Sequence, residues 1–111
     1  MVVQCSMANI LRDPPLDKHP VAKWHPNEKL RGVCWLWDAN EKLLEVLATT
    51  DVRITLREIH EVRSGPRAYV HYISFEEILD QQARDQRVQI AIERWKPIHQ
   101  TPHLPRTDPT A

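Results

Sequence analysis

The nine prolines of this 111-residue chain are concentrated at its two ends. Eight of them lie outside residues 28–96, and Pro66 alone lies inside that stretch. Proline has no backbone N–H to donate and fixes its own φ angle, so it is excluded from helix interiors and from central strands. The distribution predicts an extended proline-rich arm over residues 1–27, one compact domain over residues 28–96 and a proline-rich tail over residues 97–111.

The charge balance limits the classes of partner that the chain could bind. It carries 15 basic and 15 acidic side chains, and residues 27–96 alone carry 11 and 12. Binding to a phosphate backbone depends on a basic field that releases counterions, and no such field is present. Nucleic acid is therefore not the favoured partner.

The cysteines and the apolar runs indicate a compartment. Cys5 and Cys34 are too few for a disulfide framework, which favours a reducing, cytoplasmic location. No run approaches the length of about 18 apolar residues that a membrane span needs. The N-terminus also lacks the basic and apolar regions of a secretory signal. Arginine outnumbers lysine ten to five, which indicates a GC-rich gene and hence a bacterial or phage source.

Residues 32–48 contain one strand and one ambiguous segment. Residues 32–38 are rich in strand formers and end at Asp38-Ala39-Asn40, a turn sequence. Residues 41–48 fit a helix capped by Asn40, and they equally fit the return strand of a hairpin. Intrinsic propensity slightly favours the helix.

Residues 52–73 are predicted to form a β-hairpin. Apolar residues alternate with polar ones over 52–56 and again over 68–72, on either side of Ser64-Gly65. Two β-rich runs around a Ser-Gly turn are typical of a hairpin.

Ser74-Phe75-Glu76-Glu77 has the form of a capping box, which predicts an amphipathic helix over residues 74–86. Apolar residues then alternate at 88, 90 and 92, which predicts a strand over residues 87–95. The alternative is one continuous helix over residues 74–95, because no glycine separates the two parts. The predicted fold class is therefore α+β, with a small antiparallel sheet that includes the 52–73 hairpin.

The aromatic residues suggest a surface for a partner. Trp35 and Trp37 share one face of the predicted strand, and a domain this small has little material to cover both sheet faces. Tryptophan and tyrosine dominate the energetics of protein interfaces. The predicted contact residues are Trp35, Trp37, Tyr69 and Trp95. The alternative is that the arms fold over the tryptophan face, with Trp24 beside it.

A second hypothesis is a small enzyme. In the predicted hairpin, Glu58 lies opposite His71 and His60 lies opposite Tyr69, a set that could carry general acid–base catalysis. The structural alternative is an ordinary solvated face of a ribbon. Cys34 lies in an apolar run and is expected to be a core residue rather than a nucleophile.

No metal site or cofactor is predicted. His99 and His103 have a spacing that could bind zinc on a helix, but Pro102 lies between them and precludes one. A closed zinc site also needs a full tetrahedral ligand set, which nearby residues do not supply.

These observations predict a non-enzymatic interaction module, a cytoplasmic regulator or inhibitor that covers a surface of another protein and forms a homodimer. A further alternative is a nucleic-acid-binding regulator, because the sequence around Gly65 is weakly helix-turn-helix-like. Its contacts would be the arginines of the 52–73 segment, Arg53, Arg57, Arg63 and Arg67.

Overall fold

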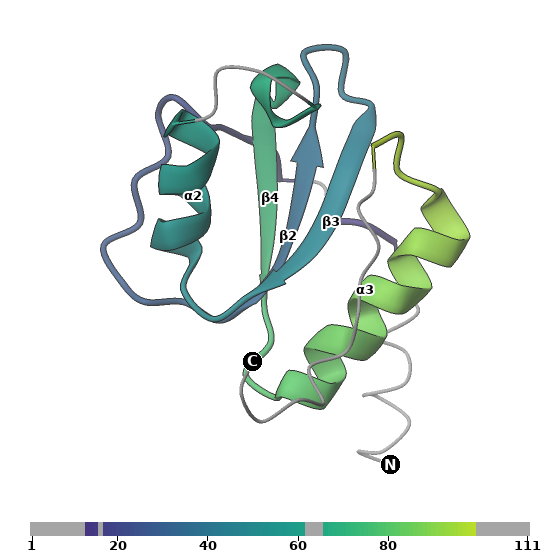
Figure 1. The fold of residues 1–111 in the computed structure, drawn as a ribbon. Helices are drawn as coiled ribbons and strands as arrows, with labels where there is room; N and C mark the ends of the chain where they lie inside the picture. The colour runs from purple at the N-terminus through teal and green to yellow at the C-terminus, as the bar shows by residue number, and fades with distance from the viewer. Residues whose placement is uncertain (1–12, 16, 62–65, 100–111) are drawn as a thin grey trace.

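The computed structural model describes residues 13–15, 17–61 and 66–99. A four-stranded antiparallel sheet lies between two helices, one on each face (Figure 1). This confirms the α+β class and the small antiparallel sheet. Because residues 1–12 and 100–111 lie outside the described part, the extended arms stay a prediction.

The strands lie in the order β1-β4-β2-β3, and all neighbouring pairs are antiparallel. Along the chain, the elements are β1 (His19–Pro20), β2 (Gly32–Trp37), β3 (Leu43–Thr49), α2 (Val52–Glu61), the 3₁₀ turn η1 (Pro66–Tyr69), β4 (Tyr72–Glu77) and α3 (Gln81–Trp95). Strand β2, which lies between β4 and β3, confirms the strand expected at residues 32–38.

The ambiguous segment at 41–48 is a strand, so the slight preference for a helix is wrong. The side chain of Asp38 closes the hairpin turn, because its Oδ1 accepts from the backbone N–H of Asn40 at 2.8 Å and of Lys42 at 2.9 Å. Pairing of β3 with β2 then buries Leu44 and Val46. Tertiary pairing outweighs the helix propensity of the leucines.

The predicted hairpin over 52–73 is wrong, because residues 52–61 form helix α2. Val52, Leu56 and Ile59 are spaced to share one helical face, and all three are buried. Ile54, the residue that completed the apparent alternation, is 49% exposed. Residues 62–65, which hold the expected turn, lie outside the described residues.

The predicted start of the helix at residue 74 is also wrong, because Ser74 and Glu76 belong to strand β4. Ser74 and Glu76 are instead buried and accept hydrogen bonds from tryptophan side chains, while Glu77, the second residue of the expected capping box, is exposed. Helix α3 begins later, after Asp80, whose Oδ2 accepts from the Ala83 backbone N–H at 2.8 Å. A single helix over 74–95 is excluded for the same reason.

The strand expected at 87–95 is wrong, because these residues lie within α3. The buried residues of α3 recur at helical spacing: Arg84, Arg87, Val88 and Ala91. Two of these four positions are arginines, so an apolar stripe was not visible in the sequence. The Nη1 atom of Arg84 donates to the carbonyl oxygens of Ile78 and Leu79, at 3.0 and 2.7 Å.

The sheet separates two hydrophobic clusters. On the α3 face, the buried residues are Val33, Trp35, Trp37, Val46, Val88 and Ala91. On the α2 face, they are Cys34, Leu36, Val52, Leu56, Ile59 and Ile73. Helix α3 thus covers the tryptophan face, and the expectation that this face is uncovered is wrong.

A buried ion pair lies inside the α3 cluster. The Oε1 atom of Glu76 accepts from Trp35 Nε1 at 2.8 Å and from Arg87 Nε at 2.9 Å. Its Oε2 accepts from Arg87 Nη2 at 3.0 Å, and that same nitrogen donates to the Asp13 carbonyl oxygen at 3.1 Å. The guanidinium also lies 4.8 Å from the Trp35 ring centre. This network joins β2, β4, α3 and the N-terminal segment.

The Glu76–Arg87 pair predicts strong thermodynamic coupling. Glu76→Gln or Arg87→Met alone should lower the free energy of unfolding by about 3–5 kcal/mol, because each leaves its partner buried and unpaired. The double variant should lose clearly less than the sum of the two. Urea denaturation followed by far-UV circular dichroism measures this cycle, and additive losses would contradict it. Glu41→Gln breaks only the more exposed Lys18 pair and should cost at most about 1 kcal/mol.

Gly32 is required by the close packing of β4 on β2. A Cβ atom at this position would overlap the carbonyl oxygen of Glu76 and the ring of Phe75. We expect Gly32→Ala to destabilise the protein by about 1–3 kcal/mol, because the strands must separate to admit the methyl group. Thermal unfolding measures the loss. An unchanged melting temperature would show that β4 can shift without cost.

Candidate functional site

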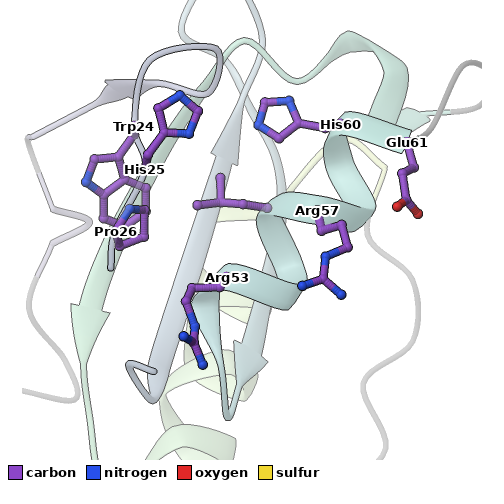
Figure 2. Close-up of a pocket in the computed structure, with 8 residues that line it drawn as sticks. Trp24, His25, Pro26, Arg53, Arg57, His60 and Glu61 are labelled. Atoms are coloured by element: carbon purple, nitrogen blue, oxygen red, sulfur yellow. The ribbon is translucent and has the colours of Figure 1, made fainter. Parts of the chain in front are cut away.

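An open groove lies between helix α2 and the chain segment that precedes β2 (Figure 2). Its volume is about 550 Å³. It is lined by Trp24, His25, Pro26, Arg53, Leu56, Arg57, His60 and Glu61. Both walls are held by specific contacts.

The first wall is the chain segment that follows β1. The N–H groups of Lys23 and Trp24 donate to the Pro20 carbonyl oxygen, at 3.0 and 3.1 Å, and form a turn. The Trp24 ring then stacks on His19, with centroids 4.9 Å apart and planes 10° apart, and leans on Phe75 at 6.2 Å. Trp24 is therefore held in place before any ligand arrives.

The second wall is α2, whose start is tied to the first wall. The Val52 N–H donates to the Leu30 carbonyl oxygen at 3.0 Å. From there, Arg53, Leu56, Arg57 and His60 follow at helical spacing, so they lie along one side of the helix. Leu56 is buried and the other three are exposed.

The two arginines of this wall differ in how they are held. Asp51 accepts from Arg53 Nε at 3.0 Å through Oδ1 and from Arg53 Nη2 at 2.9 Å through Oδ2. These side-chain hydrogen bonds, with the backbone N–H of Arg53, hold the pKa of Asp51 below its ordinary value. For Arg57, the described residues include no hydrogen-bond or ion-pair partner. Its guanidinium is open to a ligand.

The polar groups that line the groove are two guanidinium groups, two imidazoles and the carboxylate of Glu61. The rings of His25 and His60 face each other across the end of the groove, with centroids 6.4 Å apart (Figure 2). Chemically, the groove can hold an anionic group next to an apolar one.

The four residues of the enzyme hypothesis are not brought together as predicted. Glu58 and His60 lie on α2, Tyr69 lies in η1 and His71 precedes β4, so the predicted cross-strand pairing does not exist. His60 lines the groove. Tyr69 lines a second hollow of about 380 Å³ near the β2–β3 turn, and Glu58 and His71 line neither.

The four predicted contact residues divide into buried and exposed ones. Trp35 and Trp37 are 0% and 7% exposed, and their indole N–H groups donate to Glu76 and Ser74 inside the core. Trp95 is partly buried and meets the Trp35 ring edge-on at 5.6 Å. Tyr69 is 70% exposed. Of the four, only Tyr69 is well exposed to a partner.

The arginines of the nucleic-acid hypothesis do not form a basic surface. Arg67 donates through Nε and Nη2 to the buried Glu45 carboxylate, both at 3.1 Å, and these hydrogen bonds raise the pKa of Arg67. Arg53 is paired with Asp51. Arg63 lies outside the described residues. Of these four arginines, Arg57 is the one described residue whose guanidinium is open.

Cys34 is a core residue, as expected. It is fully buried beneath α2, and burial raises the pKa of its thiol to about 12. The thiolate is the reactive form, so this residue is not a nucleophile at neutral pH. Cys5 lies outside the described residues.

Neither a metal site nor a membrane helix is found among the described residues. They contain no group of three or more potential ligands among His, Cys, Asp and Glu. Of the two histidines with zinc-like spacing, His103 lies outside the described residues. The backbone N–H of His99 donates to the Leu44 carbonyl oxygen at 2.9 Å. No described helix combines the length and apolar character needed to cross a bilayer.

Sequence reasoning missed the groove because it assigned strand geometry to residues 52–61. The available signal was Asp51, an N-cap residue, followed by buried positions at helical spacing. Comparison with protein-family models, with curated proteins and with solved structures finds no match. The groove is therefore interpreted from its own residues.

The Asp51–Arg53 pair predicts a pH-dependent contribution to stability. An Asp with a lowered folded-state pKa stabilises the protein above its unfolded-state pKa of about 3.9, and this is lost as pH falls through the folded-state pKa. Asp51→Asn keeps a good N-cap but removes the charge. We therefore expect a lower melting temperature than wild type at pH 7 and convergence near pH 2.

Melting temperatures measured across this pH range test the prediction. Glu93→Gln removes an exposed carboxylate from α3 and serves as the control, with little effect expected at any pH. A constant difference between Asp51→Asn and wild type from pH 7 to pH 2 would contradict the charge-based explanation.

Proposed function

We propose that this protein is a non-enzymatic interaction module, a cytoplasmic regulator or inhibitor that binds a segment of another protein in the groove and thereby covers it. The observation that carries the proposal is a preformed groove with Trp24 on one wall and the open Arg57 guanidinium on the other. Arginine and tryptophan are the residue types most enriched where interfaces have their strongest contacts.

Preorganisation supports binding at this groove. Ordering side chains on association costs free energy, so residues already held in place favour binding. Trp24 is held by His19 and Phe75, and Arg53 is held by Asp51. Of the two guanidinium groups that line the groove, only that of Arg57 has to be ordered on binding.

The dispersal of the candidate acid–base residues favours binding over catalysis. Glu58 and His71 line neither described hollow, and the thiol of Cys34 is buried. The cytoplasmic location is supported by this free thiol.

A charge-reversal experiment tests the proposal. Tagged wild-type protein should capture a stoichiometric protein partner from its native lysate, and Arg57→Glu should lose it. Lys42→Glu makes the same charge change in the exposed β2–β3 turn and should retain the partner. Circular dichroism checks that both variants are folded. No captured partner, or equal capture by both variants, would contradict the proposal.

Two sequence predictions remain beside this proposal. Tyr69, exposed next to Ile98 at the second hollow, stays a predicted contact residue. The homodimer also stays a prediction, although its original argument, an uncovered tryptophan face, no longer applies. Size-exclusion chromatography with light scattering measures the oligomeric state.

A further inference from the structure

We propose that the occupant of the groove is an acidic peptide segment that carries one large apolar side chain. This inference rests on the proposed function and specifies the chemistry of the partner. Its carboxylates would pair with Arg57 and with the unused edge of Arg53, while the apolar side chain would pack on Trp24 and Leu56.

The position of the guanidinium groups favours carboxylate ligands. Arg53 and Arg57 are one helical turn apart on the same side of α2, and both border the groove (Figure 2). Arg53 donates to Asp51 through Nε and Nη2. Among the contacts of the described residues, its Nη1 has no partner and can donate to a ligand. Arg57 can offer its full planar edge, which matches a carboxylate in a two-bond arrangement.

The apolar part of the groove lies beside these charges. Trp24 and Pro26 are half-buried on one wall, and Leu56 lies on the other. Since the Trp24 ring is fixed by His19, an incoming apolar side chain buries its surface without first ordering the indole. The ligand therefore needs both a negative charge and an apolar group.

A peptide fits these features better than a nucleic acid does. Binding to a phosphate chain requires a row of unpaired cations along its path. Among the lining residues only Arg53 and Arg57 carry a guanidinium, one helical turn apart, which is too short a row to follow a phosphate chain. The whole chain also has no net charge.

Nuclear magnetic resonance titration of the full-length ¹⁵N-labelled chain tests the inference. The probe is the capped peptide acetyl-Asp-Glu-Phe-Asp-Glu-amide. It should shift the indole N–H signal of Trp24 and the amide signals of α2. The indole signals of Trp35 and Trp37, bonded inside the core, should not move.

Matched peptides and variants identify the source of binding. Replacing Phe by Gly in the peptide, or Arg57→Gln in the protein, should weaken binding by about tenfold. Lys42→Gln removes a distant positive charge and should leave the affinity unchanged. No shift at Trp24 with the acidic peptide would overturn the inference. Two further probes are oligothymidylate and a peptide in which lysine replaces each of the four acidic residues. Tighter binding of either one than of the acidic peptide would also overturn the inference.

Failure of this inference is distinguishable from failure of the proposed function. If Arg57→Glu loses a captured partner but the acidic peptide does not bind, the assigned chemistry is wrong and the interaction function stands. If the peptide binds as expected but no partner is captured, the groove chemistry stands and the proposed function is wrong.

Discussion

The bidentate contact between Glu76 and Arg87 is the interaction on which the rest of the structure depends. It places an arginine of α3 and a glutamate of β4 in the interior, where both are almost fully buried. The same carboxylate accepts the indole N–H of Trp35, and the same guanidinium reaches the Asp13 carbonyl oxygen. Because a buried charge without its partner is costly, helix, sheet and N-terminal segment must assemble together.

The α2 face repeats this arrangement with different residues. Arg67, from η1, makes a bidentate contact with Glu45, which is buried on β3. Each face of the sheet therefore contains an Arg–Glu pair within or beside its apolar cluster. These two pairs satisfy the arginines and glutamates that the fold buries, whereas Arg57 lies on the exposed side of α2, where it lines the groove.

The path of the N-terminal segment creates the groove. Asp13 and Lys18 lie on the α3 side, where Asp13 contacts Arg87 and Lys18 lies 4.4 Å from the Trp37 ring centre. The chain then pairs with the edge of β4 through His19 and Pro20 and crosses to the α2 side, where Trp24 and Leu30 pack. A segment that wraps a sheet edge in this way leaves a hollow where it passes the exposed side of a helix.

Sequence alone determined the fold class, the strand at β2, the core position of Cys34 and the absence of a basic field, because these follow from composition, proline placement and local runs. Only the tertiary structure decided the identity of the elements after Val52. The alternation of Val52, Ile54 and Leu56 and the capping box at Ser74 are both valid local patterns. The first pattern fails because Val52, Leu56 and Ile59 are buried together against the sheet at helical spacing. The second fails because Ser74 and Glu76 are buried in β4, where Glu76 pairs with Arg87 of α3. The groove was likewise invisible in the sequence, since Trp24 and Arg57 become neighbours only through a wrapped chain and a helix.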